Sequence, residues 1–210
     1  MHKRTFPFLL LAAYCLLFFY CAVSPYDRAV WWAENIPIVL IVAFLVATYR
    51  RFTFSNTAYA MMSVLIFMHT IGGHYTFERV PFGFVTDLFH FQRNHYDRVA
   101  HFSVGLYAFA LMEFIERRRL SNSRALTALF AVAAIFATAA IYEIFEFVYA
   151  VMADPAAGIA VLGSQGDVWD AQKDMLADGL GSIAAALFYL AWYRKPPLPQ
   201  LLKEPSDSSG

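Results

Sequence analysis

Residues 125–151 read ALTALFAVAAIFATAAIYEIFEFVYAV, and the first 18 of these 27 residues carry no charged side chain. About 20 mostly apolar residues in a helix are enough to cross the roughly 30 Å hydrocarbon core of a bilayer. Because that core offers no water, a spanning backbone must satisfy its own hydrogen bonds, as a helix does. This stretch therefore predicts a membrane-spanning helix.

Five further stretches have the same apolar character. With the first one they predict an all-α, polytopic membrane bundle of about six transmembrane helices: Phe6–Val23, Val30–Tyr49, Asn56–Tyr75, Val99–Phe114, Ala125–Val151 and Met175–Tyr193. The composition agrees, since 60% of the 210 residues are hydrophobic and 15% are charged, against about 45–50% and about 25% in soluble domains. We expect residues 1–195 to form one transmembrane domain and the Pro- and Ser-rich residues 196–210 to form a disordered cytoplasmic tail.

The distribution of cations predicts which way the bundle faces. With a cytoplasmic N-terminus, eleven Lys and Arg residues fall inside, and only five fall outside: Arg28, Arg79, Arg93, Arg98 and Lys173. This bias follows the positive-inside rule, so both termini are predicted to be cytoplasmic in a multi-pass protein of the bacterial inner membrane. The formal net charge is zero, which excludes a global basic field for binding nucleic acid.

In this orientation, polar side chains from several helices meet at the outer, periplasmic end of the bundle. The candidate metal ligands are His69, His74, Asp97, His101, Asp167, Asp170, Asp174 and Asp178. The candidate contacts to an anionic substrate are Arg93, Asn94, Arg98 and Gln165. The candidate catalytic acids and bases are Glu143, Glu146 and His101.

The spacing of these residues places several of them on common helix faces. Asp97 and His101 are four residues apart, and Glu143 and Glu146 are three apart, so each pair shares a face. The last helix is predicted to start near Ser164 and to carry an i, i+3, i+7, i+11 stripe: Asp167, Asp170, Asp174 and Asp178. Several carboxylates are therefore expected to point into one cavity.

Imidazoles and carboxylates that converge from several helices suit a divalent ion such as Mg²⁺, Mn²⁺ or Zn²⁺. Such an ion polarises a phosphoryl or carbonyl oxygen and activates water, while guanidinium groups match the geometry of phosphate. We expect a metal-assisted site that binds, hydrolyses or transfers an envelope lipid or a phosphorylated head group. Membrane lipids, including an anionic or lipid-linked substrate, are the expected partners.

Two other interpretations stay open. In a proton- or ion-coupled transporter, Glu143, Glu146 and Asp178 would carry the ion, although the charges gather on one side of the membrane. In a non-catalytic membrane scaffold, Arg93 and Arg98 would form an ion-pair network with the acids and hold the outer loops together.

Two motifs resemble those of a known family. RNHYDRVAHF at residues 93–102 and GSQGDVWDAQKDM at residues 163–175 are similar to segments of the YjdF family of bacterial inner-membrane proteins, over almost the whole chain. That resemblance implies an inner-membrane location and supplies no reaction. A fainter similarity to VanZ-like membrane proteins rests on Asp97, His101, Glu146 and the acidic start of the last helix. It implies a role in the cell envelope and favours an envelope lipid as substrate.

Overall fold

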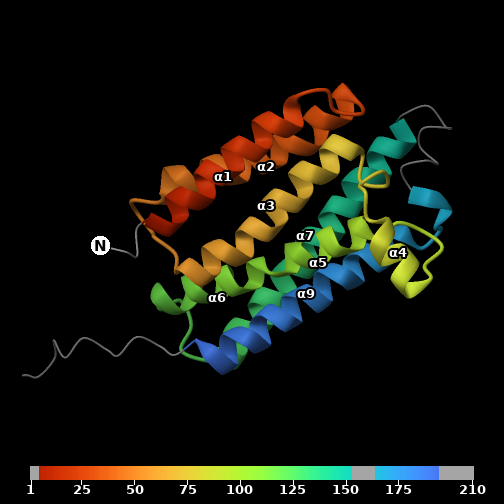
Figure 1. Cartoon of the computed structure of the whole chain (residues 1–210). Coiled ribbons are helices and arrows are strands. Elements are labelled where there is room, and N and C mark those ends of the chain that lie inside the picture. The colour runs from red at the N-terminus through yellow and green to blue at the C-terminus, as the bar shows by residue number, and fades with distance from the viewer. Residues whose placement is uncertain (1–4, 153–163, 194–210) are drawn as a thin grey trace, which may run out of the picture.

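The computed structural model describes residues 5–152 and 164–193, and its regular secondary structure is helical (Figure 1). The elements are α1 (Thr5–Ala22), α2 (Arg28–Thr48), α3 (Asn56–Tyr75), α4 (Gly83–Phe89), α5 (Tyr96–Gly105), α6 (Tyr107–Arg117), α7 (Arg124–Met152), the 3₁₀ turn η2 (Ser164–Gly166) and α9 (Asp170–Trp192). No β-strand occurs in the described part of the chain, so the all-α class is confirmed. The predicted tail, residues 196–210, lies outside the described residues.

Five helical stretches are long and apolar enough to cross a membrane: α1, α2, the consecutive α5 and α6, α7 and α9. The predicted sixth span corresponds to α3, which has 20 residues but is not among these five. It carries polar residues such as His69 and His74 in its last turns. Helix α3 packs against α1, α2, α5 and α6, and polar residues of a membrane helix usually face such neighbouring helices.

The outward faces of the bundle are apolar. Leu16 of α1, Leu40 of α2, and Leu129 and Phe145 of α7 each expose more than 60% of their surface. Apolar surface in water costs about 25 cal/mol per Å², whereas hydrocarbon removes that penalty. These helices are therefore suited to a lipid environment.

The core lies where α9 packs against α6 and α7. Phe109, Met112 and Tyr189 are almost completely buried there, and their neighbours include Ala131 and Ala185. Small residues at helix contacts let the backbones approach closely, which strengthens the packing of membrane helices. The bundle is therefore tightest around α9, whose first turns carry the aspartates.

The contact between α5 and α9 depends on two glycines. A Cβ atom at Gly105 would overlap the α9 backbone at Asp178 and Ser182, and a Cβ at Gly181 would overlap the carbonyl oxygen of Phe102. The predicted helix Val99–Phe114 is also divided just after Gly105, into α5 and α6. This close approach joins the end of α5 to the middle of α9, further along both helices than the ion pairs between their first turns.

The start of α9 differs from the prediction, because the helix does not begin near Ser164. Gln165 and Gly166 adopt positive φ angles of 55° and 80°, and this left-handed backbone interrupts a helix. Asp167 then accepts a hydrogen bond from the Trp169 N–H at 3.1 Å, in the turn that precedes the helix. The predicted stripe of four is therefore reduced to three buried residues within α9: Asp170, Asp174 and Asp178.

Candidate functional site

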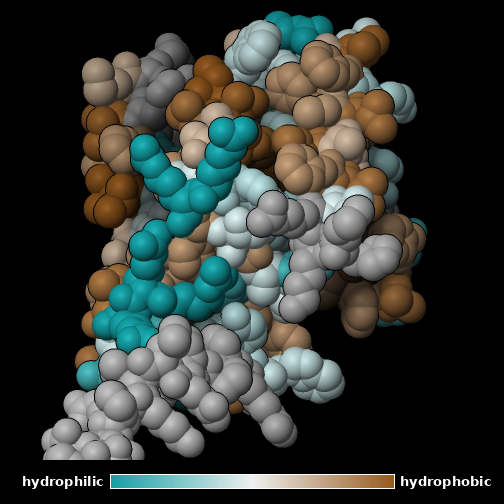
Figure 2. Space-filling model, turned by 90° about the vertical axis from the view of Figure 1, so that its left-hand side faces the viewer, coloured by the Kyte–Doolittle hydropathy of each residue, from teal (hydrophilic) through white to brown (hydrophobic). Residues whose placement is uncertain are grey.

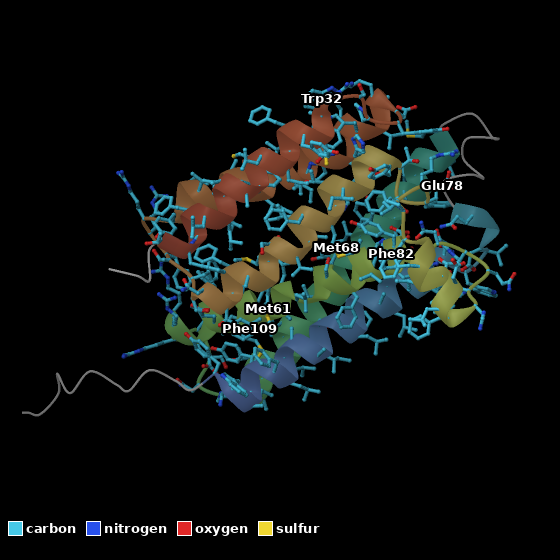
Figure 3. All side chains as sticks on the ribbon, viewed as in Figure 1. Trp32, Met61, Met68, Glu78, Phe82 and Phe109 are labelled. Atoms are coloured by element: carbon cyan, nitrogen blue, oxygen red, sulfur yellow. The ribbon has the colours of Figure 1, made fainter. Side chains whose placement is uncertain are left out.

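The end of the bundle where α5 and α9 begin is covered by the loop that contains α4 (Figures 1 and 3). Asn94 fastens this loop, since its side-chain amide donates to the carbonyl oxygens of Glu78 at 3.0 Å and Val80 at 2.8 Å. Its Oδ1 accepts from the N–H of Tyr96 at 2.9 Å, at the start of α5. Figure 3 shows Glu78 and Phe82 in this loop beside α5.

Asn94 and Gln165 also join this loop to the segment before α9. The Asn94 N–H donates to Gln165 Oε1 at 3.0 Å, and Gln165 Nε2 donates to the Asn94 carbonyl oxygen at 3.0 Å. Both residues were predicted to bind substrate. In the structure their amides are engaged with the protein itself, which makes them bridges between two loops.

Arg98 stands at the centre of the ion pairs. Its two Nη atoms contact Asp170 and Asp174, and Nη2 lies 3.4 Å from Asp167 Oδ2. The Arg98 side chain is only 12% exposed, so the pairs are shielded from water. Removing one partner from a buried pair leaves an uncompensated charge. Arg98 therefore holds the first turn of α5 against the first turns of α9.

Arg93 differs from Arg98 in having N–H donors without hydrogen-bond partners among the described residues. Its Nη1 lies 3.1 Å from Asp167 Oδ2 and 2.9 Å from Asp170 Oδ1. Its Nε and Nη2 atoms are buried and have no hydrogen-bond partner among the described residues. Buried donors are normally satisfied, and a guanidinium edge with two donors matches a carboxylate or phosphate. Arg93 is therefore the candidate contact for an anionic group.

His101 connects the two helices through both ring nitrogens. Nδ1 lies 3.3 Å from Asp178 Oδ2, while Nε2 lies 3.6 Å from Asp174 Oδ1 and 3.9 Å from Asp97 Oδ1. One ligand atom each from Asp97, His101 and Asp174 lies within 4.8 Å of the others. A carboxylate on the second nitrogen of a histidine is the usual support for a metal ligand, and Asp178 occupies that place.

Asp178 adds a further sign of an incomplete site. The residue is 1% exposed, and its Oδ1 has no hydrogen-bond partner among the described residues. A buried carboxylate oxygen without a partner is costly, and an ion or water is a common explanation.

Helix α7 contributes two carboxylates on the side of His101. The Tyr142 ring lies 6.5 Å from the His101 ring, and Glu143 and Glu146, next to Tyr142 in sequence and one turn further along α7, are half-buried. Neither glutamate forms an ion pair with a residue that the structure describes. They are therefore available as proton acceptors or as further cation ligands.

The charges around this site do not balance. We use the name acidic cluster for the residues that surround it: Arg93, Asp97, Arg98, His101, Asp167, Asp170, Lys173, Asp174 and Asp178. Five carboxylates face three permanent cations, and the two α7 glutamates add to the excess. Buried charges are normally paired or coordinate metals, so this excess favours a bound cation.

Outside the membrane-spanning helices, two groups in this region have shifted pKa values. A hydrogen bond from Lys173 Nζ, 2.7 Å from Asp167 Oδ2, lowers the pKa of Asp167 to about 2. Burial, reinforced by the nearby Arg93, lowers the pKa of His95. At neutral pH Asp167 is therefore ionised and His95 is neutral.

The comparisons with known proteins agree with this architecture. Residues 6–195 match the family described as "Predicted membrane protein (DUF2238)". The chain belongs to this family. It is 34% identical over 179 residues to "Inner membrane protein YjdF" of Escherichia coli (strain K12), which covers 82% of this chain and 83% of that protein. No solved structure matches the chain. The predictions of a YjdF-like family and of a multi-pass inner-membrane protein are confirmed.

Two histidines of this DUF2238 member lie apart from the three-residue group. His69 Nε2 pairs with Glu34 Oε2 at 3.0 Å, and His74 Nδ1 lies 2.7 Å from the carbonyl oxygen of Cys21. The structure does not bring these predicted ligands together with Asp97 and His101. They instead connect α3 to α2 and to the end of α1.

Sequence reasoning missed Glu34, the partner of His69. A signal was present, because Glu34 is a carboxylate inside the apolar stretch Val30–Tyr49. Ionisable residues inside membrane segments are rare and usually have a partner in the bundle. Their identification requires a search within each span as well as at its ends.

Proposed function

We propose that this DUF2238 member binds a divalent cation between Asp97, His101 and Asp174. The cation then acts as a Lewis acid on the phosphorylated head group of an anionic envelope lipid. The proposal includes α3 as the sixth span, cytoplasmic termini and a site at the periplasmic face. The observation that carries it is the group of three ligand atoms within 4.8 Å, inside an acidic cluster with an excess of carboxylates.

The ligand types indicate which ions fit. Carboxylate oxygens suit Mg²⁺ and Mn²⁺, and an imidazole nitrogen extends the choice to Zn²⁺. Such an ion supplies Lewis acidity to a phosphoryl oxygen. Asp178 holds His101 by its other nitrogen, which directs Nε2 toward the two carboxylates.

The other side chains then take separate roles. Arg93 offers two free donors to the anionic head group, whereas Arg98 is occupied by aspartates and positions α9. Glu146, with Glu143 beside it, is the candidate base for a water molecule because neither is consumed by an ion pair with a described residue. The two glutamates stand on α7, so the site would require three helices: α5, α7 and α9.

Metal analysis of the detergent-purified protein tests the proposal. Without chelators, we expect about one Mn²⁺ or Zn²⁺, or a titratable Mg²⁺, per chain of the wild type. His101→Ala and Asp174→Asn should lose it, whereas Asp87→Asn, which removes an exposed acid of α4, should keep it. Wild-type protein that neither retains nor binds any of these ions would refute the metal site. Phosphate release from a phosphorylated lipid by the loaded protein would then test for hydrolysis.

The structure also gives one specific argument for a non-catalytic scaffold. Arg98 bridges Asp170 and Asp174, and Asn94 and Gln165 join the loops at the same end. In that case Asp174→Asn should lower the thermal unfolding midpoint equally with and without metal. A metal-dependent difference between wild type and Asp174→Asn would favour the binding site.

A further inference from the structure

The opposite end of the bundle is rich in cations. It carries six described arginines, namely Arg50, Arg51, Arg117, Arg118, Arg119 and Arg124, and two carboxylates, Glu113 and Glu116. Figure 2 looks onto this end and shows hydrophilic side chains gathered beside strongly hydrophobic ones. This is the end that the cation bias predicts to be cytoplasmic.

Both carboxylates at this end are already engaged. Arg117 Nη1 lies 2.6 Å from Glu113 Oε1, and Arg124 Nε lies 3.1 Å from Glu116 Oε1. We call these four residues the paired network. The remaining four arginines have no ion pair with any residue in the described ranges. Among them, Arg118 donates to the carbonyl oxygen of Arg51 at 3.3 Å, which brings these two chain segments together.

A groove of about 670 Å³ leads to these two arginines. It runs across α3 between α2 and α6, and its walls are apolar side chains such as Leu40, Phe44 and Leu111. Arg51 and Arg118 line the same groove. Its volume lies within the range of about 300–1,000 Å³ that is usual for ligand sites.

We infer that this groove binds an anionic phospholipid, with an acyl chain along Leu40 and Phe44 and the phosphate between Arg51 and Arg118. Helices α2 and α6 belong to membrane-spanning stretches, so the groove faces hydrocarbon and acyl chains fill it without exposing apolar surface to water. Guanidinium groups hold phosphate by paired hydrogen bonds. The inference is independent of the metal site, which lies at the other end of the bundle.

A neighbouring groove with a single arginine provides a comparison for the expected preference between anionic and zwitterionic lipids. It has a volume of about 420 Å³, lies between α1, α2 and α3, and contains one cation, Arg50. Each cation close to an anionic lipid strengthens binding by about fivefold. The groove at Arg51 and Arg118 should therefore prefer an anionic over a zwitterionic lipid by about 30-fold, and the smaller groove by much less.

Lipid titration of the detergent-purified full chain tests the inference. Phosphatidylglycerol should raise the thermal unfolding midpoint at about 30-fold lower concentration than phosphatidylcholine with the same chains. The double variant Arg51→Gln/Arg118→Gln should lose this preference, whereas the control Arg119→Gln should keep it, because Arg119 lines neither groove. A groove-filling Leu40→Trp, which leaves both arginines intact, should also weaken the response.

Three outcomes would overturn the inference. The first is an equal wild-type response to both lipids, and the second is a preference that survives in the double variant. The third is equal stabilisation by water-soluble glycerol 3-phosphate, which would assign the arginines to a soluble anion. If the double variant proves unstable, Leu40→Trp alone decides the matter, since an undiminished response to phosphatidylglycerol there contradicts occupation of the groove.

Discussion

The acidic cluster and the paired network both join carboxylates to cationic side chains, at opposite ends of one bundle, yet they differ in how completely their hydrogen bonds and charges are satisfied. In the paired network, Glu113 is fully buried and accepts hydrogen bonds from the Ser55 N–H at 2.8 Å, the Ser55 hydroxyl at 2.6 Å and Arg117. Glu116 accepts from Arg124 and from the Tyr189 hydroxyl at 3.1 Å.

The acidic cluster lacks this completeness. It has more carboxylates than cations, and atoms of Arg93 and Asp178 are buried without partners among the described residues. A satisfied network of buried charges is explained by folding alone, because each group finds its counterpart within the chain. An unsatisfied one needs a further explanation, for which a bound ion or water is a common candidate. The comparison therefore supports a structural role for the paired network and agrees with the proposed binding role of the acidic cluster.

The largest effect is expected at the glycine contact that holds the acidic cluster together. Gly105→Leu would drive a side chain into the α9 backbone at Asp178 and Ser182, where neither helix can yield without separating. We expect a destabilisation of more than about 3 kcal/mol, seen as loss of monodisperse protein in size-exclusion chromatography. Gly83→Ala, where a Cβ meets open space, is the control and should remain folded. A well-folded Gly105→Leu protein would show that the α5–α9 contact is not needed.

An intermediate effect is expected in the paired network. Glu113→Ala removes the acceptor for Ser55 and Arg117 and leaves the Ser55 donors unpaired beside the space of the lost side chain, which should lower stability by about 1–3 kcal/mol. The measurement is thermal or denaturant unfolding in detergent, with and without added Mn²⁺. Because the paired network is complete without a metal ion, the loss should be the same under both conditions. If added Mn²⁺ restored the stability of Glu113→Ala, the paired network would also depend on a ligand, and the difference between the two networks would not hold.

The smallest effect is expected at the rim of the acidic cluster. Since Lys173 holds the pKa of Asp167 at about 2, below its ordinary value of 3.8, ionised Asp167 stabilises the fold above about pH 4 and loses this contribution as the pH falls toward 2. Lys173→Met should bring the pKa of Asp167 closer to 3.8, so that less stability is lost as the pH falls from 4 toward 2. Unfolding midpoints between pH 2 and 5 measure the difference. Superimposable curves for wild type and variant would show that this pair contributes nothing.

Much of the molecule follows from its sequence. Long apolar stretches predict spanning helices because the bilayer imposes length and hydropathy on each segment separately, and five of them meet that standard in the structure. Local spacing also placed Asp97 with His101, and Asp174 with Asp178, on common helix faces. The family motifs at residues 93–102 and 163–175 lie where α5 and α9 begin.

Only the tertiary structure decided which of these polar groups meet. His69 and His74 looked equivalent to His101 in sequence, but α3 turns them toward Glu34 and Cys21. Glu113 lies near the end of the predicted span Val99–Phe114, and only the structure shows that it is fully buried. The reason is physical: hydropathy and periodicity describe one helix at a time, whereas a pairing depends on the rotation and depth of one helix against another. In this chain Gly105 and Gly181 permit a close approach of the two helices because they lack a Cβ atom, but only the structure shows which backbone atoms meet there.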